Sequence, residues 1–207
     1  MMKVSVIMPS YLGQYENCAK DRDRKFLRAV KSFIDQNYPE RELIIVSDGC
    51  EITNALYKHN FESFRNIKLV PMEKQPLFSG EVRQRGILSA TGDIICFLDS
   101  DDLIMPHHLR VIASTISTIG MDQWIMFSDN YKHPADGKIY PRQFKPEFGY
   151  MGTSNIAYKR NLPVSWSGCD GYGHDWKFIQ QLMKIGEGKR IYGAGYVVCH
   201  IPQQLDV

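Results

Sequence analysis

Residues 93–102 read DIICFLDSDD, so an apolar run from Ile94 to Leu98 passes directly into three closely spaced carboxylates. A short, continuous apolar run of this kind is typical of a strand that is buried on both faces of a parallel sheet. Carboxylates this close together repel one another unless a cation joins them. The stretch therefore predicts a buried strand that ends either in a solvated acidic turn or in a cation site.

Three further apolar runs predict that this strand belongs to a parallel sheet. They cover residues 3–8, 42–47 and, more weakly, 67–72. Helical patterns lie between and after these runs, and strands that alternate with helices are typical of βαβ crossovers. We therefore expect an α/β fold with a mostly parallel central sheet flanked by helices. The expected helices are 26–34, 52–63, 79–90 and 106–119.

The second half of the chain has a mixed pattern and is richer in Gly and Pro. One amphipathic helix is expected in the stretch 173–186, GHDWKFIQQLMKIG, where Gly186 ends the helical pattern. No linker, internal repeat or low-complexity segment separates the two halves, so we expect a single domain over residues 1–207. The strands expected in this half are 124–128, 155–158, 190–192 and 196–200.

Composition is that of an ordinary globular protein, with 43% hydrophobic and 23% charged residues and a net charge of +2. This charge is too small to indicate a nucleic-acid partner. The five cysteines are scattered, which favours free thiols in a reducing compartment over a disulfide framework or a zinc site. No apolar stretch approaches the ~18 residues of a membrane helix. We expect a cytoplasmic protein without a transmembrane segment.

Polar side chains follow the predicted strands where each of them ends. Tyr11 comes after the first strand, Asp48 after the second, and the acidic cluster Asp99, Asp101 and Asp102 after the strand that begins near residue 93. The carboxyl ends of parallel strands share one edge of a sheet, where α/β folds place their ligands. These side chains should therefore converge on one crevice.

The acidic cluster suits a hard divalent cation, either Mg²⁺ or Mn²⁺. Such ions usually complete their coordination with substrate phosphates and water, so a phosphorylated substrate is expected. An EF-hand loop fits poorly, because Leu103 and Ile104 stand where ligands are needed. Phosphatases of the haloacid dehalogenase type also carry D-x-D after an apolar strand, but usually after the first one. A solvated acidic turn remains the simplest alternative.

Four stretches in the same order and spacing resemble family-2 glycosyltransferases of the GT-A fold. The resemblance implies an inverting, metal-dependent enzyme that uses Mn²⁺ or Mg²⁺. Its donor is a nucleotide-diphosphate sugar, most commonly a UDP-sugar, and its acceptor is a hydroxyl of a glycan, a lipid-linked molecule or another glycoconjugate. Residues 1–102 would bind the donor and residues 103–207 the acceptor. The four stretches are VSVIMPSY (4–11), SFIDQNYPERELIIVSDGC (32–50), GEVRQRGILSATGDIICFLDSDD (80–102) and GHDWKFIQQL (173–182).

The resemblance assigns the nucleotide base to the ends of the first two strands. Pro9 and Tyr11 correspond to the loop that packs against the base, and Asp48 to the acid that accepts a hydrogen bond from it. Ser47 stands where many members have a second Asp. A turn closed by Asp48 and Gly49 is the alternative that the residues themselves allow.

The diphosphate and the metal are assigned to the next two stretches. Arg83 corresponds to the Arg of a motif usually written A-R-N, although this chain reads V-R-Q, and Arg85 is a second basic candidate. Asp99 and Asp101 form the D-x-D pair, with Ser100 between them in the nucleotide-sugar site. Asp101 is the expected metal ligand, and Asp99 lies near the ribose or the metal. An exposed helix position is the alternative for Arg83.

The resemblance makes Asp175 the general base, with His174 in place of the family's usual Glu. A carboxylate at this position also suits the N-terminus of a helix, so Asp175 is alternatively a helix cap. Asp170 and His174 are the next candidates for the base. His200 ends an expected strand and is either a third metal ligand or a structural histidine.

The segment 12–25 is longer than the family usually has and carries several basic residues. It either extends the following helix or forms a flap near the donor. Two other classes of function remain open: a metal-dependent phosphatase or nucleotidyltransferase on a similar sheet, and a non-catalytic sugar-binding relative. The sequence names neither sugar nor acceptor, and it leaves room for peripheral membrane contact.

Overall fold

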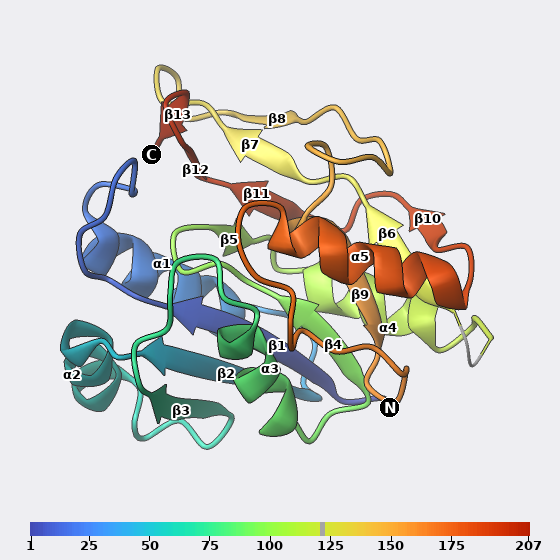
Figure 1. Ribbon diagram of the computed structural model, residues 1–207, viewed down its shortest axis with the longest axis horizontal. Helices are drawn as coiled ribbons and strands as arrows, with labels where there is room; N and C mark the ends of the chain where they lie inside the picture. Colours follow the sequence, from blue (N-terminus) through green and yellow to red (C-terminus); the bar gives the residue numbers. More distant parts are fainter. Residues whose placement is uncertain (121–122) are drawn as a thin grey trace.

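The computed structural model describes residues 1–120 and 123–207, and within them seven strands form the central sheet in the order β10-β6-β9-β4-β1-β2-β3 (Figure 1). Five helices cover this sheet in the described chain. The central strands are β1 (Val4–Ser10), β2 (Arg41–Asp48), β3 (Ile67–Met72), β4 (Ile94–Phe97), β6 (Trp124–Phe127), β9 (Ile156–Lys159) and β10 (Lys189–Ile191). The helices are α1 (Arg22–Ile34), α2 (Glu51–Asn60), α3 (Glu81–Leu88), α4 (His108–Ile116) and α5 (His174–Ile185).

The strands of the first half run in parallel, as the apolar runs predict. β1 pairs with β2 on one side and with β4 on the other, and β2 pairs with β3. β9 lies antiparallel between β4 and β6, which makes the second half mixed. The carboxyl ends of β1, β2, β3 and β4 therefore lie at one edge of the sheet.

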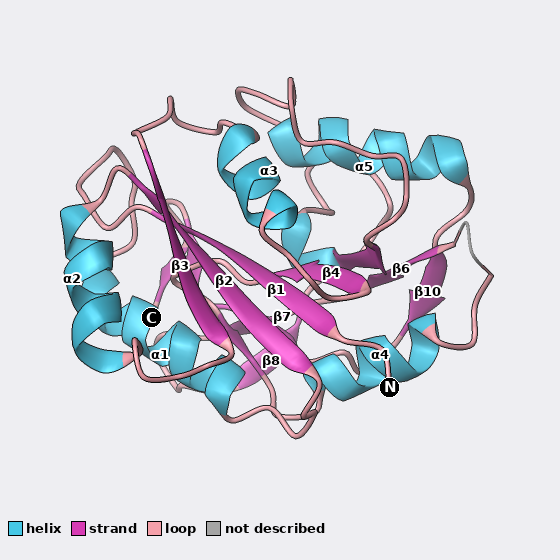
Figure 2. Cartoon of the chain, turned by 90° about the horizontal axis from the view of Figure 1, so that it is seen from below, coloured by secondary structure: helices cyan, strands magenta, loops and turns pink. Residues whose placement is uncertain are grey.

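Helices cover both faces of the sheet because its strands are apolar on both sides. Val4, Val6 and Met8 pack into the core that α1, α2 and α4 cover, while Ile7 belongs to the core beneath α3 and α5. Figure 2 shows this arrangement, with α3 and α5 on the opposite side of the sheet from α1, α2 and α4. Two fully apolar faces explain why the predicted strands lack a polar alternation.

A second, smaller sheet lies beside the carboxyl edge and was not predicted as a unit. In the described chain it has four strands in the order β5-β11-β7-β8, and a separate hairpin joins β12 to β13. These strands have two or three residues each, too few to show a periodicity. The run predicted over 196–200 divides at Cys199 into β11 and β12. The strands are β5 (Leu103–Ile104), β7 (Asn130–Lys132), β8 (Ile139–Pro141), β11 (Tyr196–Val198), β12 (His200–Ile201) and β13 (Leu205–Asp206).

The segment 12–25 divides into a loop and the start of a helix. Its last four residues are the first turn of α1, which therefore begins at Arg22, and the preceding residues form a loop. Buried side chains at helical spacing, including Phe26, Val30 and Phe33, explain where α1 faces the core. α4 is shorter at both ends than its predicted range of 106–119. None of the helices in the described ranges has the length and apolar character that crossing a membrane requires.

Candidate functional site

A cavity of about 530 Å³ opens at the carboxyl edge of the central sheet. Its walls come from the ends of β1, β2 and β4, from the loop 148–155, and from residues 172–176 at the start of α5. The expected convergence of the strand ends is therefore observed. The predicted site residues that line this cavity are Pro9, Tyr11, Asp48, Arg83, Asp99, Ser100, Asp101, Asp175 and His200.

Asp48 is held at the cavity wall by the segment that follows β3. Its Oδ2 lies 2.8 Å from the Nζ of Lys74, and its Oδ1 accepts a hydrogen bond of 2.6 Å from the backbone N–H of Gln75. Gly49 is needed beside it, because its φ is +58° and a Cβ there would lie 2.7 Å from the backbone N of Lys74. Asp48 is thus more than a turn residue, since it fixes a neighbouring loop.

Arg83 is buried in the cavity wall and is not a solvated helix residue. Its Nη2 lies 3.2 Å from Oδ1 of Asp99, and its Nη1 lies 3.2 Å from Nε2 of His174. The guanidinium also stacks over the Trp166 ring, 5.1 Å from the ring centre. Arg85, on the same helix, is exposed and does not line the cavity. Of the two basic candidates, only Arg83 therefore faces the site.

Asp175 contacts the same ring nitrogen of His174 that Arg83 contacts. Its Oδ1 is 2.9 Å from Nε2 of His174. Burial raises the pKa of the Asp175 carboxyl, but the positive charge of Arg83 and the contact with His174 outweigh burial and lower this pKa to about 2. Asp175 is therefore ionised at neutral pH.

The loop 148–155 approaches Asp175 closely because it contains glycine. A Cβ on Gly152 would lie 3.1 Å from Oδ2 of Asp175. Asp170, the alternative base, lies outside the cavity lining, and its Oδ1 accepts the backbone N–H of Gly80 at 3.1 Å. Asp175 is thus the carboxylate that the α5 end presents to the cavity.

The three carboxylates after β4 have three different environments. Asp99 pairs with Arg83, as described above. Asp102 is buried and accepts hydrogen bonds from the Tyr196 hydroxyl at 2.9 Å and from the backbone N–H of Cys199 at 2.7 Å. Among the described residues, none donates a hydrogen bond to the carboxylate of Asp101, whose backbone carbonyl accepts one from Arg28.

Burial and mutual repulsion perturb two of the carboxylates in this cluster. Burial raises the pKa of Asp102, and the negative charges of Asp101 and Asp99 raise it further. Burial likewise raises the pKa of Asp99, although Arg83 acts in the opposite direction. Within residues 1–120 and 123–207, no group of three or more His, Cys, Asp or Glu side chains forms a complete metal site. The free Asp101 carboxylate instead suits an ion that shares its coordination with a substrate and water.

His200 lines the same cavity, but other groups face its ring. Its Nε2 lies 3.0 Å from the carbonyl oxygen of Asn17, and its Nδ1 lies 3.5 Å from Oδ1 of Asp206. These contacts join the C-terminal hairpin to the loop before α1. Metal ligation by His200 therefore stays a prediction.

The loop before α1 covers part of the predicted base pocket. The ring of Tyr15 stacks with that of Tyr11, with the ring centres 6.5 Å apart. Lys74 approaches the Tyr11 ring as well, with its Nζ 4.4 Å from the ring centre. Residues 12–21, called the flap below, thus form a loop that reaches Tyr11 and the cavity, and its place near the donor stays a prediction.

Aromatic side chains surround the cavity mouth next to Asp175. The Phe148 ring lies 6.2 Å from that of Tyr172 and 6.5 Å from that of Trp176, centre to centre. Tyr172 is 84% exposed and Phe148 is 53% exposed. Phe148 packs over Gly173, where a Cβ would lie 2.9 Å from the ring.

Lys74 and Tyr15 are the main cavity residues that the sequence did not identify. Lys74 follows the third parallel strand, so the rule that found Asp48 could have found it as well. Tyr15 has no such signal, because its place depends on how the loop 12–21 folds back over Tyr11. The sequence offers His174 as the residue in place of the family's Glu and as an alternative base; the structure adds that it contacts both Arg83 and Asp175.

The fold, with its cavity at the carboxyl edge of the sheet, is that of a GT-A glycosyltransferase domain. The model for the family "Glycosyl transferase family 2" matches residues 5–176. The chain therefore belongs to this family.

Relatives with similar sequences carry glycosyltransferase names. An uncharacterized glycosyltransferase of Nostoc sp., alr2836, is 30% identical over 56% of this chain and 34% of its own length. YwdF of Bacillus subtilis, also an uncharacterized glycosyltransferase, is 25% identical over 95% of this chain and 74% of its own length. The poly(ribitol-phosphate) beta-N-acetylglucosaminyltransferase TarS of Staphylococcus aureus is 27% identical over 56% of this chain. The chain thus spans about a third of alr2836, and the TarS match covers 19% of that protein.

Solved structures of S. aureus TarS share the fold. The structure of TarS residues 1–349 has a TM-score of 0.73 and 18% identity, covering 95% of this chain and 60% of that one. The same protein in complex with UDP-GlcNAc has a TM-score of 0.72 and 19% identity, covering 95% and 58%.

Proposed function

We propose that this protein transfers a sugar from a UDP-sugar to an acceptor hydroxyl with inversion at the anomeric carbon. The observation that carries the proposal is one cavity with two kinds of carboxylate. Asp175 is ionised at the start of α5, whereas burial raises the pKa of Asp99 and Asp102 after β4. Active sites commonly hold carboxyl groups whose environments give them different pKa values, and each group then has a different chemical role.

The donor lies, in this proposal, along the edge from β1 to β4. Tyr11 and Asp48 hold the base, and Arg83 lies beside the diphosphate. The complex of TarS with UDP-GlcNAc, a protein of the same fold, supports a uridine nucleotide as the ligand. Asp48 can accept a hydrogen bond from an N–H of the base once Lys74 shares or releases the Asp48 carboxylate.

The residues that would hold a divalent cation are Asp101 and, beside it, Asp99. The ion, when bound, supplies positive charge that stabilises the diphosphate as a leaving group. Two observations support this assignment: the Asp101 carboxylate, which has no hydrogen-bond partner among the described residues, lines the cavity, and the pKa of Asp99 is raised. His200 would join Asp101 as a ligand of this ion only if the contacts of its ring with Asn17 and Asp206 changed.

Asp175 acts as the general base on the acceptor. It accepts the proton of the acceptor hydroxyl while the hydroxyl oxygen forms a bond to the anomeric carbon. The bond between that carbon and the diphosphate oxygen breaks, and its electron pair leaves with the diphosphate. A pKa of about 2 keeps Asp175 ionised, and the proton transfers only as the new bond forms.

The acceptor enters past the loop 148–155, next to Asp175. Exposed aromatic rings at this mouth suit a carbohydrate, whose ring C–H groups pack against the negative face of an aromatic ring. Phe148, Tyr172 and Trp176 are the aromatic residues that line the cavity here. The acceptor hydroxyl is therefore expected to belong to a glycan or glycoconjugate.

A donor-hydrolysis screen tests the proposal. The protein is incubated with UDP-, GDP- and CMP-sugars and Mn²⁺, and the nucleotide products are identified by chromatography. Release of intact UDP from a UDP-sugar is the expected result. Parallel assays test the alternatives: release of inorganic phosphate from a sugar phosphate would indicate a phosphatase, and release of pyrophosphate from UTP and a sugar phosphate would indicate a nucleotidyltransferase. Binding of a UDP-sugar without turnover, even with glycan acceptors, would indicate a non-catalytic relative.

A further inference from the structure

Arg22 is a buried cation in the wall of the cavity. It is the first residue of α1, where the flap 12–21 ends, and only 8% of the residue is exposed. Its Nη1 donates a hydrogen bond of 2.6 Å to the carbonyl oxygen of Gly13, and its guanidinium carbon lies 4.6 Å from the centre of the Tyr15 ring. These contacts hold the planar guanidinium in one orientation.

The charge of Arg22 has no anionic partner in the described parts of the chain. No carboxylate of residues 1–120 and 123–207 forms an ion pair with it, and its Nε is buried without a hydrogen-bond partner. Its neighbours in sequence, Asp21 and Asp23, are exposed. Buried charges are normally paired, because leaving one uncompensated is costly. The arrangement is therefore incomplete without an anion.

Arg22 lies close to the acidic cluster through Tyr15. Burial raises the pKa of the Tyr15 hydroxyl, the charge of Arg22 lowers it, and the charge of Asp101 raises it. Arg22, Tyr15 and Asp101 all line the one cavity. An anion bound by Arg22 would thus lie in the same cavity as Asp101.

We propose that Arg22 binds a phosphate group of the donor diphosphate, an assignment that rests on the proposed function. A guanidinium presents paired N–H donors that match two phosphate oxygens, and it is stronger in this role than an ammonium. The flap 12–21 thereby delivers a second arginine to the diphosphate, in addition to Arg83. The long segment before α1 is then a donor-binding element of this chain.

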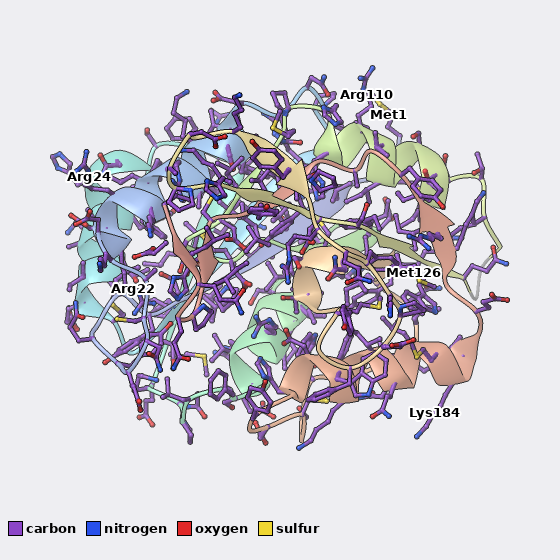
Figure 3. All side chains as sticks on the ribbon, turned by 90° about the horizontal axis from the view of Figure 1, so that it is seen from above. Met1, Arg22, Arg24, Arg110, Met126 and Lys184 are labelled. Carbon is purple, nitrogen blue, oxygen red and sulfur yellow. The ribbon has the colours of Figure 1, made fainter. Side chains whose placement is uncertain are left out.

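Calorimetric titration with uridine, UMP and UDP in the presence of Mn²⁺ tests this assignment. The variants are Arg22→Gln and Arg22→Lys, with Arg24→Gln as a matched control on the same helix. Arg24 is exposed, and Figure 3 shows it at the outer edge of the molecule. Thermal melting of each variant monitors folding.

Arg22→Gln should bind UDP about 10- to 100-fold more weakly than the wild type, because a charge-assisted hydrogen bond is lost. Its affinity for uridine should be unchanged, and Arg24→Gln should bind all the ligands as the wild type does. Weakened binding of UMP as well as UDP would assign Arg22 to the phosphate next to the ribose. Weakened binding of UDP alone would assign it to the terminal phosphate.

Equal UDP affinity in Arg22→Gln and the wild type would overturn the assignment, and an anion on the acceptor would then be the partner. An equal loss for uridine and UDP would overturn it too, since the defect would not involve phosphate. If Arg22→Gln does not fold, the affinities of Arg22→Lys for UDP and uridine are compared instead. This variant keeps the positive charge but lacks the paired N–H donors of the guanidinium. A wild-type protein that binds no uridine nucleotide would contradict the proposed function itself.

Discussion

The Nζ of Lys74 lies 2.8 Å from Oδ2 of Asp48 and 4.4 Å from the centre of the Tyr11 ring. The segment after β3 is thereby attached to the two residues that the resemblance assigns to the nucleotide base. Because the backbone N–H of Gln75 also donates to Asp48, both carboxylate oxygens have partners. Binding of a base at Asp48 must therefore involve this loop as well as the carboxylate.

Replacement of Asp48 by alanine should weaken base recognition. The variant loses the acceptor for the base N–H, and its affinity for UDP should fall by roughly 10- to 150-fold. The affinity for uridine should fall to the same extent, because the lost contact is to the base. This result would distinguish Asp48 from Arg22, whose replacement should leave uridine binding unchanged. Calorimetry on both ligands checks the prediction. Glu73→Ala, an exposed carboxylate in the same loop, is the control; unchanged UDP affinity in Asp48→Ala would leave Asp48 with only a loop-holding role.

Metal dependence should reside mainly in Asp101. Wild-type protein should bind UDP about 10-fold or more tightly with Mn²⁺ than with a chelator, because a carboxylate and the diphosphate share the ion. Asp101→Ala should remove most of this difference. Paired calorimetric titrations with and without chelator provide the measurement. Equal wild-type affinities under the two conditions would rule out a metal in donor binding.

Catalysis should depend on Asp175 more than donor binding does. Asp175→Asn preserves the shape of the side chain but removes the base, so kcat should fall by about 10²–10⁴. UDP–Mn²⁺ affinity should be nearly intact, because the residue acts on the acceptor. Asp170→Asn is the matched control, since that carboxylate lies outside the cavity and an amide oxygen still accepts the N–H of Gly80. A near wild-type transfer rate in Asp175→Asn would shift the base to another group.

The pH dependence of kcat should not report Asp175. Its pKa of about 2 leaves it ionised across the working range, so protonation of this carboxylate should not limit the rate above about pH 4. If kcat falls as the pH drops below neutrality, the fall would have to come from protonation of another group. The pH–rate profile of the wild type provides the test, and a fall that disappears in Asp175→Asn would contradict the assigned pKa.

Stability at low pH should depend on Glu42, which is 1% exposed between β1 and β3. Burial raises the pKa of its carboxyl, but hydrogen bonds from Lys68 and Thr91 lower it to about 2. The folded-state pKa is thus below the unfolded-state value of about 4.3, a difference that corresponds to about 3 kcal/mol of stability. This contribution is complete above the unfolded-state pKa and is lost as the pH falls toward 2.

Urea denaturation at several pH values measures this effect. Glu42→Gln should unfold at lower urea concentration at neutral pH, and its stability should decline less than that of the wild type between about pH 5 and pH 2.5. Glu40→Gln, an exposed neighbour, should retain the full wild-type slope. An identical slope in Glu42→Gln would show that other carboxylates carry the acid sensitivity.

The sequence alone determined the fold class and the edge of the sheet at which the site lies. Four apolar runs predicted β1, β2, β3 and β4, because strands buried on both faces must be apolar throughout. The polar residues directly after them had to meet, since parallel strands end on one side. For that reason Tyr11, Asp48 and the carboxylates after β4 could be placed in one cavity before any coordinates were considered.

Only the tertiary structure decided how these groups pair. The three carboxylates of DSDD look equivalent in sequence, yet Asp99 faces Arg83, Asp102 is buried against Tyr196, and the carboxylate of Asp101 remains available. Each partner comes from a segment distant in the chain, so no local pattern contains the pairing. The same holds for Lys74 on Asp48 and for Arg22 in the cavity wall. Burial and long-range contacts, which fix the charge of each group, arise only when the chain packs.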